Sequence, residues 1–306
     1  MDEASVQLPV AEARVPALRK GLARLKRESL VVAALARLSR SPGGVIGGIT
    51  MVLLVLLAIF APYVTTYDPI KMSPPEALQP PSLVHPAGTD RFGRDILTRI
   101  VFGARISLQV GLVGVSIAVV VGGAVGLLAG YFGGWVDSVA SFCVNVLLAL
   151  PGILLALVIV AALGPGLQNV MIAVGISAIP GYARVIRGST LSAKAAGYVE
   201  AGRALGCNEL WIIFRHILPN VLPAIIVLAT LGFATAVLIG ASVSYLGLGA
   251  KPPTPEWGIM VNEGRSFLRQ AWWLSTMPGI AIMITAIALN LLGDGLRDAL
   301  DPRLKL

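Results

Sequence analysis

Long apolar stretches alternate with short polar segments along this chain. A helix needs about 20 apolar residues to cross the hydrocarbon core of a bilayer, and six stretches come close to or exceed that length. They comprise residues 43–63, 106–130, 139–163, 167–183, 221–246 and 274–292. Only the tripeptide GPG separates the third stretch from the fourth, so these two would form a tight hairpin. The pattern predicts an all-α polytopic membrane protein with six transmembrane helices.

The composition agrees with a membrane protein. Charged residues make up only 13% of the chain, whereas soluble domains carry about 25%. The net charge of +8 could indicate a nucleic-acid partner. However, Lys and Arg lie in short segments between the apolar stretches, which is how membrane topology is encoded. We therefore expect this chain to contact a lipid bilayer and no nucleic acid.

The distribution of basic residues predicts the orientation of the chain. With the N-terminus inside, sixteen Lys and Arg residues fall on the inner side and seven on the outer side. The positive-inside rule then places both termini in the cytoplasm, together with the polar insert between the fourth and fifth stretches. The first 40 residues are too long and too polar for a cleaved signal peptide, so the first stretch should remain as an anchor.

The six apolar stretches contain essentially no ionisable side chains. Proton-coupled transporters and ion pumps usually need such a group inside the bilayer, so we expect the driving energy to come from outside this chain. Small residues recur instead at every fourth position, in two stripes: Gly122, Gly126 and Gly130, then Gly232, Ala236 and Gly240. They would allow sliding contact between subunits or close packing within one bundle, and packing within the bundle is favoured.

The segment before the second apolar stretch is rich in charge. It reads HPAGTDRFGRDILTRIVFG, and Thr89 or Asp90 would cap a helix there. One face of that helix would be charged, formed by Arg91, Arg94, Asp95 and Arg99. The pattern predicts a short helix that lies in the outer membrane interface. His85 stands alone before a proline and is expected to be a solvated loop histidine rather than a metal ligand.

The last outer loop, residues 247–273, is rich in Pro, Gly and Trp. Irregular backbone cannot face lipid, so we expect this loop to fold over the bundle or to line its cavity. Trp257, Trp272 and Trp273 would suit a membrane-interface belt. The loop is also the candidate contact for an extracytoplasmic partner, or an outer gate, through Pro252, Pro253, Pro255, Glu256 and Trp257.

The polar insert contains the sequence YVEAGRALGCNELWIIFRHILPN. Residues 193–205 favour a helix, and Gly206 offers a place to turn. Asn208 is then a good N-cap for a second short helix that Pro219 would limit. Such a helix pair either lies passively on the membrane surface or inserts into a groove of a soluble partner.

This insert resembles the cytoplasmic "EAA" loop of ABC-importer permeases. The resemblance is carried by Glu200-Ala201, by Gly206 and by Leu218-Pro219, and the chain departs from the pattern at Gly202 and His216 without a change of spacing. Three further segments, GTDRFGRD, YLGLGAKPPTPEWG and GDGLRDALDPRLK, sharpen the match. Over residues 38–305 the chain is similar to the C-type permease subunit of the dipeptide/oligopeptide/nickel importer family.

The resemblance implies a type I ABC importer permease fold with cytoplasmic termini and a cytoplasmic coupling helix. It divides the chain into a basic tail, a first transmembrane helix, an outer loop with an interfacial helix, a permease core and a C-terminal tail. These are residues 1–42, 43–64, 65–104, 105–295 and 296–306. Within the core, the coupling loop would be residues 184–220 and the outer loop residues 247–273.

The resemblance also implies partners. They are a homologous second permease that completes a heterodimer, two ATPase subunits that bind ATP and Mg²⁺, and an extracytoplasmic binding protein. The chain has no G-x-x-x-x-G-K-S/T sequence, so it should bind no cofactor or metal itself and is not expected to be an enzyme. The complex would reside in a bacterial or archaeal plasma (inner) membrane. The expected ATPase-docking residues are Tyr198, Glu200, Ala201, Arg203, Ala204, Leu205 and Gly206.

The substrate implied by the resemblance is a di- or oligopeptide, with nickel chelates, glutathione or another small solute as alternatives. Candidate pathway-lining residues are Asn145, Thr235 and Ser242, although each would equally serve as an interhelical hydrogen-bonding residue. The family often carries an Arg and an Asp where this chain has Phe142 and Asn145. A self-contained secondary transporter or channel is the competing class, and it would need charged residues in the spans or an inverted repeat.

Overall fold

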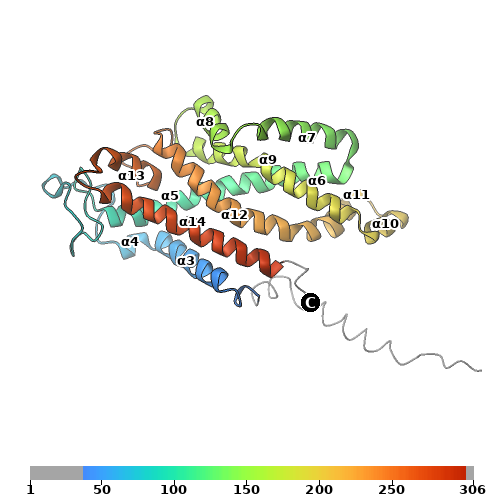
Figure 1. The fold of residues 1–306 in the computed structure, drawn as a ribbon, viewed down its shortest axis with the longest axis horizontal. Coiled ribbons are helices and arrows are strands. Elements are labelled where there is room, and N and C mark those ends of the chain that lie inside the picture. The colour runs from blue at the N-terminus through green and yellow to red at the C-terminus, as the bar shows by residue number, and fades with distance from the viewer. Residues whose placement is uncertain (1–36, 301–306) are drawn as a thin grey trace, which may run out of the picture.

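The computed structural model describes residues 37–300, which form an elongated bundle of helices (Figure 1). The described residues contain a single isolated β-bridge, between Thr89 and Asp95. Five helical segments are long and apolar enough to cross a membrane. They are α3 (Pro42–Ile59), α5 to α6 (Ile96–Phe132), α9 (Leu167–Lys194), α11 to α12 (Glu209–Tyr245) and α14 (Trp273–Leu300). The prediction of an all-α polytopic membrane protein is confirmed.

The third predicted span is broken into two helices. α7 (Gly134–Leu148) and α8 (Gly152–Leu163) meet at an angle of 91°. The break lies at Pro151, which has no N–H for the helical ladder and disfavours helical geometry at the residue before it. The sequence pattern predicted one continuous span here, because the apolar residues on both sides of the proline form one long run.

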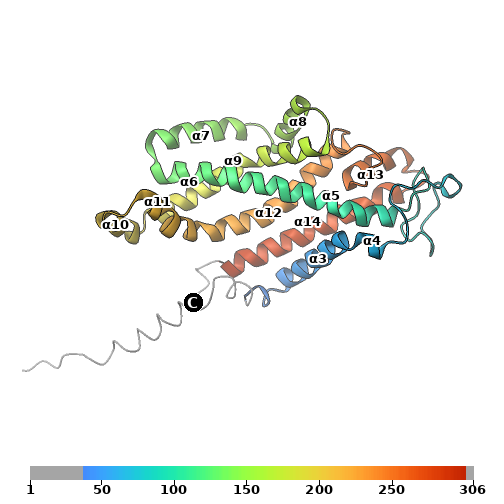
Figure 2. The same ribbon diagram turned by 180° about the vertical axis from the view of Figure 1, so that it is seen from behind.

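Contacts between α5–α6 and α9 show that these two segments run in the same direction. α5 (Ile96–Ile117), a π-helical turn (Ala118–Gly122) and α6 (Gly123–Phe132) form one continuous rod. Its glycines meet successive residues of α9: Gly114 lies beside Val174, Gly122 beside Ile179, Gly126 beside Ala183 and Gly130 beside Thr190. A chain that joins two parallel rods must return along their length. The bent α7–α8 pair makes that return and is the sixth crossing, as Figure 2 illustrates.

The first stripe of small residues, Gly122, Gly126 and Gly130, packs within the bundle, which is the alternative that the sequence favoured. A Cβ atom added to Gly126 would lie 2.4 Å from the carbonyl oxygen of Ala183. The second stripe is also internal, because an added Cβ on Gly240 would meet Val110 and one on Gly232 would meet Tyr182. The small residues therefore allow backbones of the same chain to approach closely.

α9 and α12 extend beyond the apolar stretches, residues 167–183 and 221–246, that predicted them. α9 continues as a helix through Arg184 and Arg187 to Lys194. α11 (Glu209–Ile212) passes through a π-helical turn, Ile213–Ile217, into α12 (Leu218–Tyr245). The prediction that Pro219 limits the second short helix is therefore wrong. The π turn already interrupts the regular hydrogen-bond ladder just before Pro219, so the missing proline N–H is tolerated there.

The predicted interfacial helix before the second span does not exist as a separate element. Asp95, rather than Thr89 or Asp90, is the N-cap of α5, and its Oδ2 accepts a hydrogen bond from the Thr98 N–H at 2.7 Å. The Asp90 carboxylate accepts the N–H groups of Phe92 and Arg94 (2.8 and 2.9 Å) and so stabilises a turn instead. Residues 96–104 consequently belong to the membrane-crossing helix.

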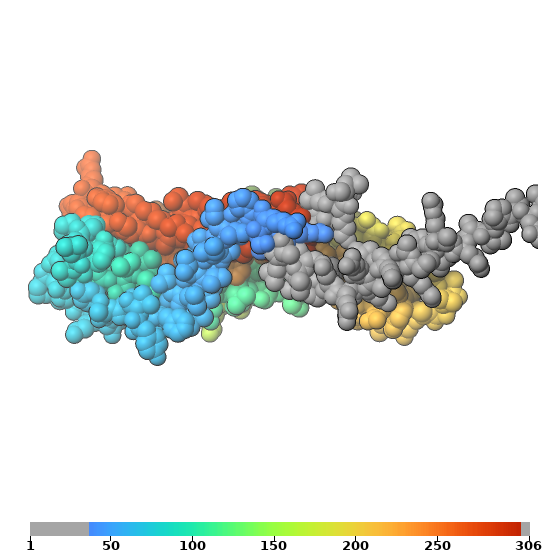
Figure 3. Space-filling model, turned by 90° about the horizontal axis from the view of Figure 1, so that it is seen from below, coloured from blue at the N-terminus to red at the C-terminus, as the bar shows by residue number. Residues whose placement is uncertain are grey.

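The first span packs lengthwise against the last. α3 lies beside α14, with Gly44 against Gly295 and Gly47 against Ala288 and Leu292 (Figure 3). α4 (Ala61–Val64) continues α3 for one turn, and a short 3₁₀ turn (Pro74–Glu76) follows in the loop that leads to α5.

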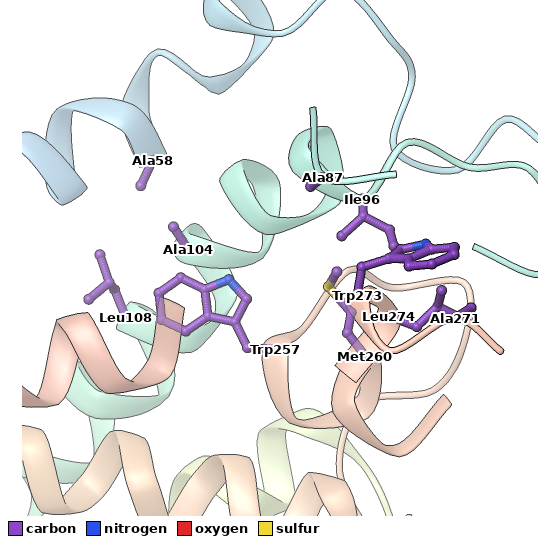
Figure 4. Packing of buried hydrophobic residues seen from close by; sticks show 10 residues of the cluster. All are labelled: Ala58, Ala87, Ile96, Ala104, Leu108, Trp257, Met260, Ala271, Trp273 and Leu274. Carbon is purple, nitrogen blue, oxygen red and sulfur yellow. The ribbon is translucent and has the colours of Figure 1, made fainter. Parts of the chain in front are cut away.

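Two tryptophans close the end of the bundle where the 247–273 loop folds back. Figure 4 shows Trp257, at the start of α13 (Trp257–Gly264), beside Ala104 and Leu108. The indole N–H of Trp257 donates to the Ile100 carbonyl (2.9 Å), and that of Trp273 donates to the Thr89 carbonyl (3.1 Å). Both side chains are buried, so the predicted interface belt is wrong for them. Trp272 alone of the three is half exposed.

Candidate functional site

A compact knob, residues 197–214, stands at one end of the bundle (Figure 1). It contains α10 (Gly197–Ala204) and α11. Gly206 turns the chain with φ +77°, where the N–H of Gly206 donates to Arg203 O (2.9 Å) and that of Cys207 to Gly202 O (3.1 Å). These two bonds form a Schellman ending, which requires a left-handed residue. The predicted turn is confirmed, and so is the Asn208 cap, whose Oδ1 accepts the Leu210 N–H at 3.0 Å.

The structure exposes every residue that the sequence proposed for docking. The exposed set is Tyr198, Glu200, Ala201, Arg203, Ala204, Leu205 and Gly206. Leu205 is the extreme case, with 83% of its surface in contact with solvent. Val199 and Gly202 lie between them in sequence but are buried, with Gly202 facing Ile212. α10 therefore uses one narrow face to hold the knob together and leaves the rest free for a partner.

The exposed surface extends beyond the predicted residues onto the following helix. Leu210, Trp211 and Phe214 are 59%, 48% and 63% exposed, whereas Ile212 and Ile217 are fully buried. The sequence did not predict that these three are exposed, because apolar side chains in such a chain usually belong to the core. The regular helical period gave no such signal, because positions 210 and 217 are seven residues apart and would share one face. The π-helical turn Ile213–Ile217 changes this register, so that Ile217 is buried while Leu210 is exposed.

Tyr131 ties the knob to the transmembrane bundle. It lies at the end of α6, almost fully buried, and its hydroxyl donates to Glu209 Oε2. The Arg203 guanidinium lies 5.4 Å from the ring centroid and 3.7 Å from Glu209. Lys194, at the end of α9, donates to the Tyr131 carbonyl at 2.6 Å. No local sequence pattern links Tyr131 to groups more than sixty positions away, so sequence analysis missed this joint.

A buried ion cluster connects two distant segments at the opposite end. Arg94 Nε lies 2.6 Å from Asp90 Oδ2, and Arg94 Nη2 lies 3.4 Å from Glu263 Oε2. Arg99 approaches Asp90 at 3.4 Å and Glu263 at 3.1 Å. Both arginine side chains are only 1% exposed. The prediction of a charged face at the membrane interface is therefore wrong, because these charges neutralise one another inside the protein.

His85 belongs to the same buried region. Its Nδ1 lies 2.9 Å from Asp95 Oδ1, and both side chains are nearly inaccessible. The prediction of a solvated loop histidine is wrong, because the Asp95 carboxylate provides the buried ring with a hydrogen-bond partner. Within residues 37–300, no group of three or more His, Cys, Asp or Glu side chains is arranged to hold a metal ion.

The five residues proposed as a partner contact or outer gate divide into two sets. Pro252 and Pro253 are exposed, whereas Pro255, Glu256 and Trp257 are buried. Glu256 caps α13, since its carboxylate accepts the N–H groups of Gly258 and Ile259, each at 2.9 Å. Burial raises the pKa of the Glu256 carboxyl, and these hydrogen bonds oppose that shift only in part. Only Pro252 and Pro253 are accessible to a partner, while Pro255, Glu256 and Trp257 set the position of the loop.

The three candidate pathway residues do not converge. Asn145 lines a cavity of about 260 Å³ between α6, α7 and α9. Ser242 lines an apolar groove between α8, α12 and α13, with its hydroxyl donating to Leu238 O at 2.7 Å. Thr235 is exposed on α12 and lines neither of these two spaces. The structure thus separates the residues that the sequence grouped by polarity alone.

The bundle and its knob define an integral membrane subunit with an exposed surface for a partner outside the bilayer. The family described as binding-protein-dependent transport system inner membrane component matches residues 96–306, and the chain belongs to this family. The N-terminal transmembrane domain of oligopeptide transport permease C matches residues 29–81. The chain is therefore a multi-pass inner-membrane permease of an ABC importer, which works with ATPase and substrate-binding partners.

Individual relatives are similar over nearly the whole chain. A dipeptide transport system permease protein, DppC, of Alkalihalophilus pseudofirmus is 47% identical over 89% of this chain and 90% of its own length. The glutathione transport system permease protein GsiD of Pectobacterium atrosepticum is 45% identical over 88% and 90%. The di/tripeptide transport system permease DppC of Pseudomonas aeruginosa is 44% identical over 86% and 89%.

The fold is also similar to that of a solved transporter. An inward-facing structure of the MetNI methionine ABC transporter aligns with a TM-score of 0.57, at 22% identity, over 67% of this chain and 98% of that one. At this identity the similarity shows the fold alone, and it agrees with the predicted type I importer permease architecture.

Proposed function

We propose that this permease passes di- or oligopeptides that an extracytoplasmic binding protein delivers. The relative named a dipeptide permease supports this substrate class, because it is 47% identical over 89% of the chain. Glutathione is the second candidate, on account of the relative that is 45% identical and named for glutathione transport. Glutathione is itself a small peptide with free carboxylates, so both candidates share one chemical class.

Uptake by the complete complex tests the substrate. Proteoliposomes with both permeases, the ATPases and the binding protein should accumulate labelled dialanine when ATP is supplied. Excess unlabelled dipeptide should compete more strongly than glutathione. Accumulation of glutathione without dialanine would shift the assignment to the second candidate, and accumulation of neither would refute the peptide class.

We further propose that the knob docks into a groove of an ATPase subunit. Two ATPase subunits would bind ATP and Mg²⁺, and a homologous second permease would complete the transmembrane part. The exposure of all seven predicted docking residues supports this role, together with the apolar surface of Leu210, Trp211 and Phe214. Short helices that present apolar and charged groups commonly bind in this way. ATP-driven movement of the groove would then reach the bundle through Tyr131 and Lys194.

Two substitutions test the docking role. Glu200→Arg reverses an exposed charge of α10, and Gly206→Pro prevents the left-handed turn. Both should abolish the coupling of ATP hydrolysis to uptake in the reconstituted complex while the permease remains in the membrane. Lys71→Glu, a charge reversal at an exposed position in the loop at the other end, is the control. Normal uptake with both knob variants would refute the proposal.

A further inference from the structure

α9 carries two arginines, Arg184 and Arg187, in the helical part that follows its apolar stretch. Arg184 precedes the helix end at Lys194 by ten residues, which corresponds to roughly 15 Å at 1.5 Å per residue. Charged side chains on a helix that enters the bilayer usually face a cavity or a partner rather than lipid. The apolar pattern alone had placed both arginines in a loop outside the membrane.

The two arginines have different partners. Arg187 binds the Asp137 carboxylate of α7 through two nitrogens, and its Nη2 lies 2.5 Å from Oδ2. Arg184 donates instead to a neutral group, the Oδ1 of Asn145, at 2.7 Å. Within residues 37–300, no carboxylate lies within ion-pair distance of Arg184. The arrangement therefore leaves one uncompensated positive charge.

That charge lies at the wall of a cavity. The cavity of about 260 Å³ is bounded by small residues of α6 and α7 and by four polar side chains: Ser141, Asn145, Arg184 and Arg187. Sites for drug-sized ligands enclose about 300–1,000 Å³. This space is smaller, so it fits the end of a short peptide rather than a whole chain of several residues.

We propose that this cavity binds the terminal carboxylate of a passing peptide, and that Arg184 is the main residue that contacts this carboxylate. This inference rests on the proposed peptide transport. The planar guanidinium matches a carboxylate with two parallel hydrogen bonds. Arg184 is exposed and held only by an amide, so it is free to change partners. The Arg187–Asp137 pair is neutral overall, so it fixes the neighbouring wall of the cavity and does not itself bind the peptide carboxylate.

Asn145 offers a near-isosteric test. Asn145→Asp would give Arg184 its own carboxylate at the same 2.7 Å position and remove the net charge of the cavity. Arg184→Gln removes that charge directly. Each variant removes the charge-assisted hydrogen bonds to the peptide carboxylate, so both should lower uptake of dialanine by the full complex about tenfold or more. Uptake of dialanine by Arg184→Lys should lie between the uptake of these two variants and that of the wild type.

Two controls separate this site from general damage. Lys71→Glu, a charge reversal at an exposed position in the loop at the other end of the bundle, should transport normally. Arg297→Gln, which removes an exposed arginine near the end of α14, should transport normally. Normal dialanine uptake by Asn145→Asp and Arg184→Gln would overturn the site and leave peptide transport intact, whereas failure of the wild-type complex to transport peptide would count against the proposed function.

A direct measurement requires no transport. Ser141→Cys places a thiol in the cavity, in a background without Cys143 and Cys207. In the complex in nanodiscs of zwitterionic lipid, dialanine should slow its labelling by a maleimide, and the C-terminal amide of dialanine should not. Arg184→Gln should abolish this protection. Protection by anionic lipid without any effect of dialanine would assign the charge to a lipid headgroup and overturn the peptide site.

Discussion

Glu256 is a buried acid whose charge opposes folding. Its pKa is raised from the ordinary value of 4.5 by burial, so the folded state binds this proton more tightly than the unfolded state does. The stability that this tighter binding supplies is complete below about pH 4.5 and is lost as the pH rises through the raised pKa of the folded state. Glu256→Gln keeps an acceptor for the Gly258 N–H and removes the titration.

The melting temperature of purified Glu256→Gln in detergent should consequently depend less on pH than that of the wild type between pH 5 and 8. We expect the wild type to lose stability relative to the variant as the pH rises. Parallel curves of melting temperature against pH for the two proteins would show that the pKa of Glu256 is the same in the folded and unfolded states.

Glu263 neutralises two buried arginines, and its removal should be costly. Glu263→Gln leaves Arg94 and Arg99 with Asp90 as their only carboxylate within 4 Å among the described residues. Removal of one partner from a buried ion pair typically costs about 3–5 kcal/mol, so we expect a clearly lower melting temperature or failure to accumulate in the membrane.

Arg91 provides the matched control for Glu263. It lies 4.0 Å from Glu263, but its side chain is 44% exposed. Exposed ion pairs contribute about 0–1 kcal/mol, so Arg91→Gln should leave the melting temperature almost unchanged. Equal losses in Glu263→Gln and Arg91→Gln would contradict the assignment of the buried cluster as the source of stability.

Among the elements, α10 depends on a single backbone conformation. Gly206 has φ +77°, and an added Cβ would meet no atom within 4 Å. Gly206→Ala therefore introduces backbone strain without a clash, and a left-handed residue other than glycine costs about 1–2 kcal/mol. Amide hydrogen exchange across α10 should become about 5–30-fold faster.

Gly197 is the control for this effect. It begins α10 at an ordinary φ and also has open space around its Cβ position. Alanine there should leave exchange unchanged or slow it, since the substitution reduces the freedom of the unfolded chain. Faster exchange in both variants would mean that any side chain, and not the turn geometry, disturbs the knob.

Local chemistry made some elements predictable. Gly206 and Asn208 act on their own neighbours within a few residues, so the turn and the cap could be read from the sequence. The bend at Pro151 also has a local cause, the missing N–H of the proline, but the long apolar run around it concealed the break. His85 and Arg99 were misjudged for a different reason: burial depends on a partner, and Arg99's partner Glu263 lies 164 positions away.

For the whole molecule, the number of crossings was predictable and the orientation stays a prediction. Six apolar stretches correspond to five long helices and one bent pair. The pathway residues were not predictable, because a cavity is formed by several helices and polarity alone does not show which side chains share it. Arg184 illustrates this, since only the extension of α9 brings it opposite Asn145.

The predicted orientation can be measured with single cysteines. In a background without Cys143 and Cys207, Leu83→Cys, at a fully exposed position of the loop before α5, should react with a membrane-impermeant maleimide on intact spheroplasts. Arg40→Cys, just before α3 and exposed, should react only after the membrane is opened. The reverse result would place both termini outside.

The buried ion cluster has a consequence for protein engineering. Residues 90–99 and Glu263 complete one electrostatic unit, although 164 positions separate Arg99 from Glu263. A chimera that exchanges only the 247–273 loop between relatives, to redirect the permease to another binding protein, would pair arginines from one parent with an acid from the other. Such grafts should transplant both segments together, as a single module.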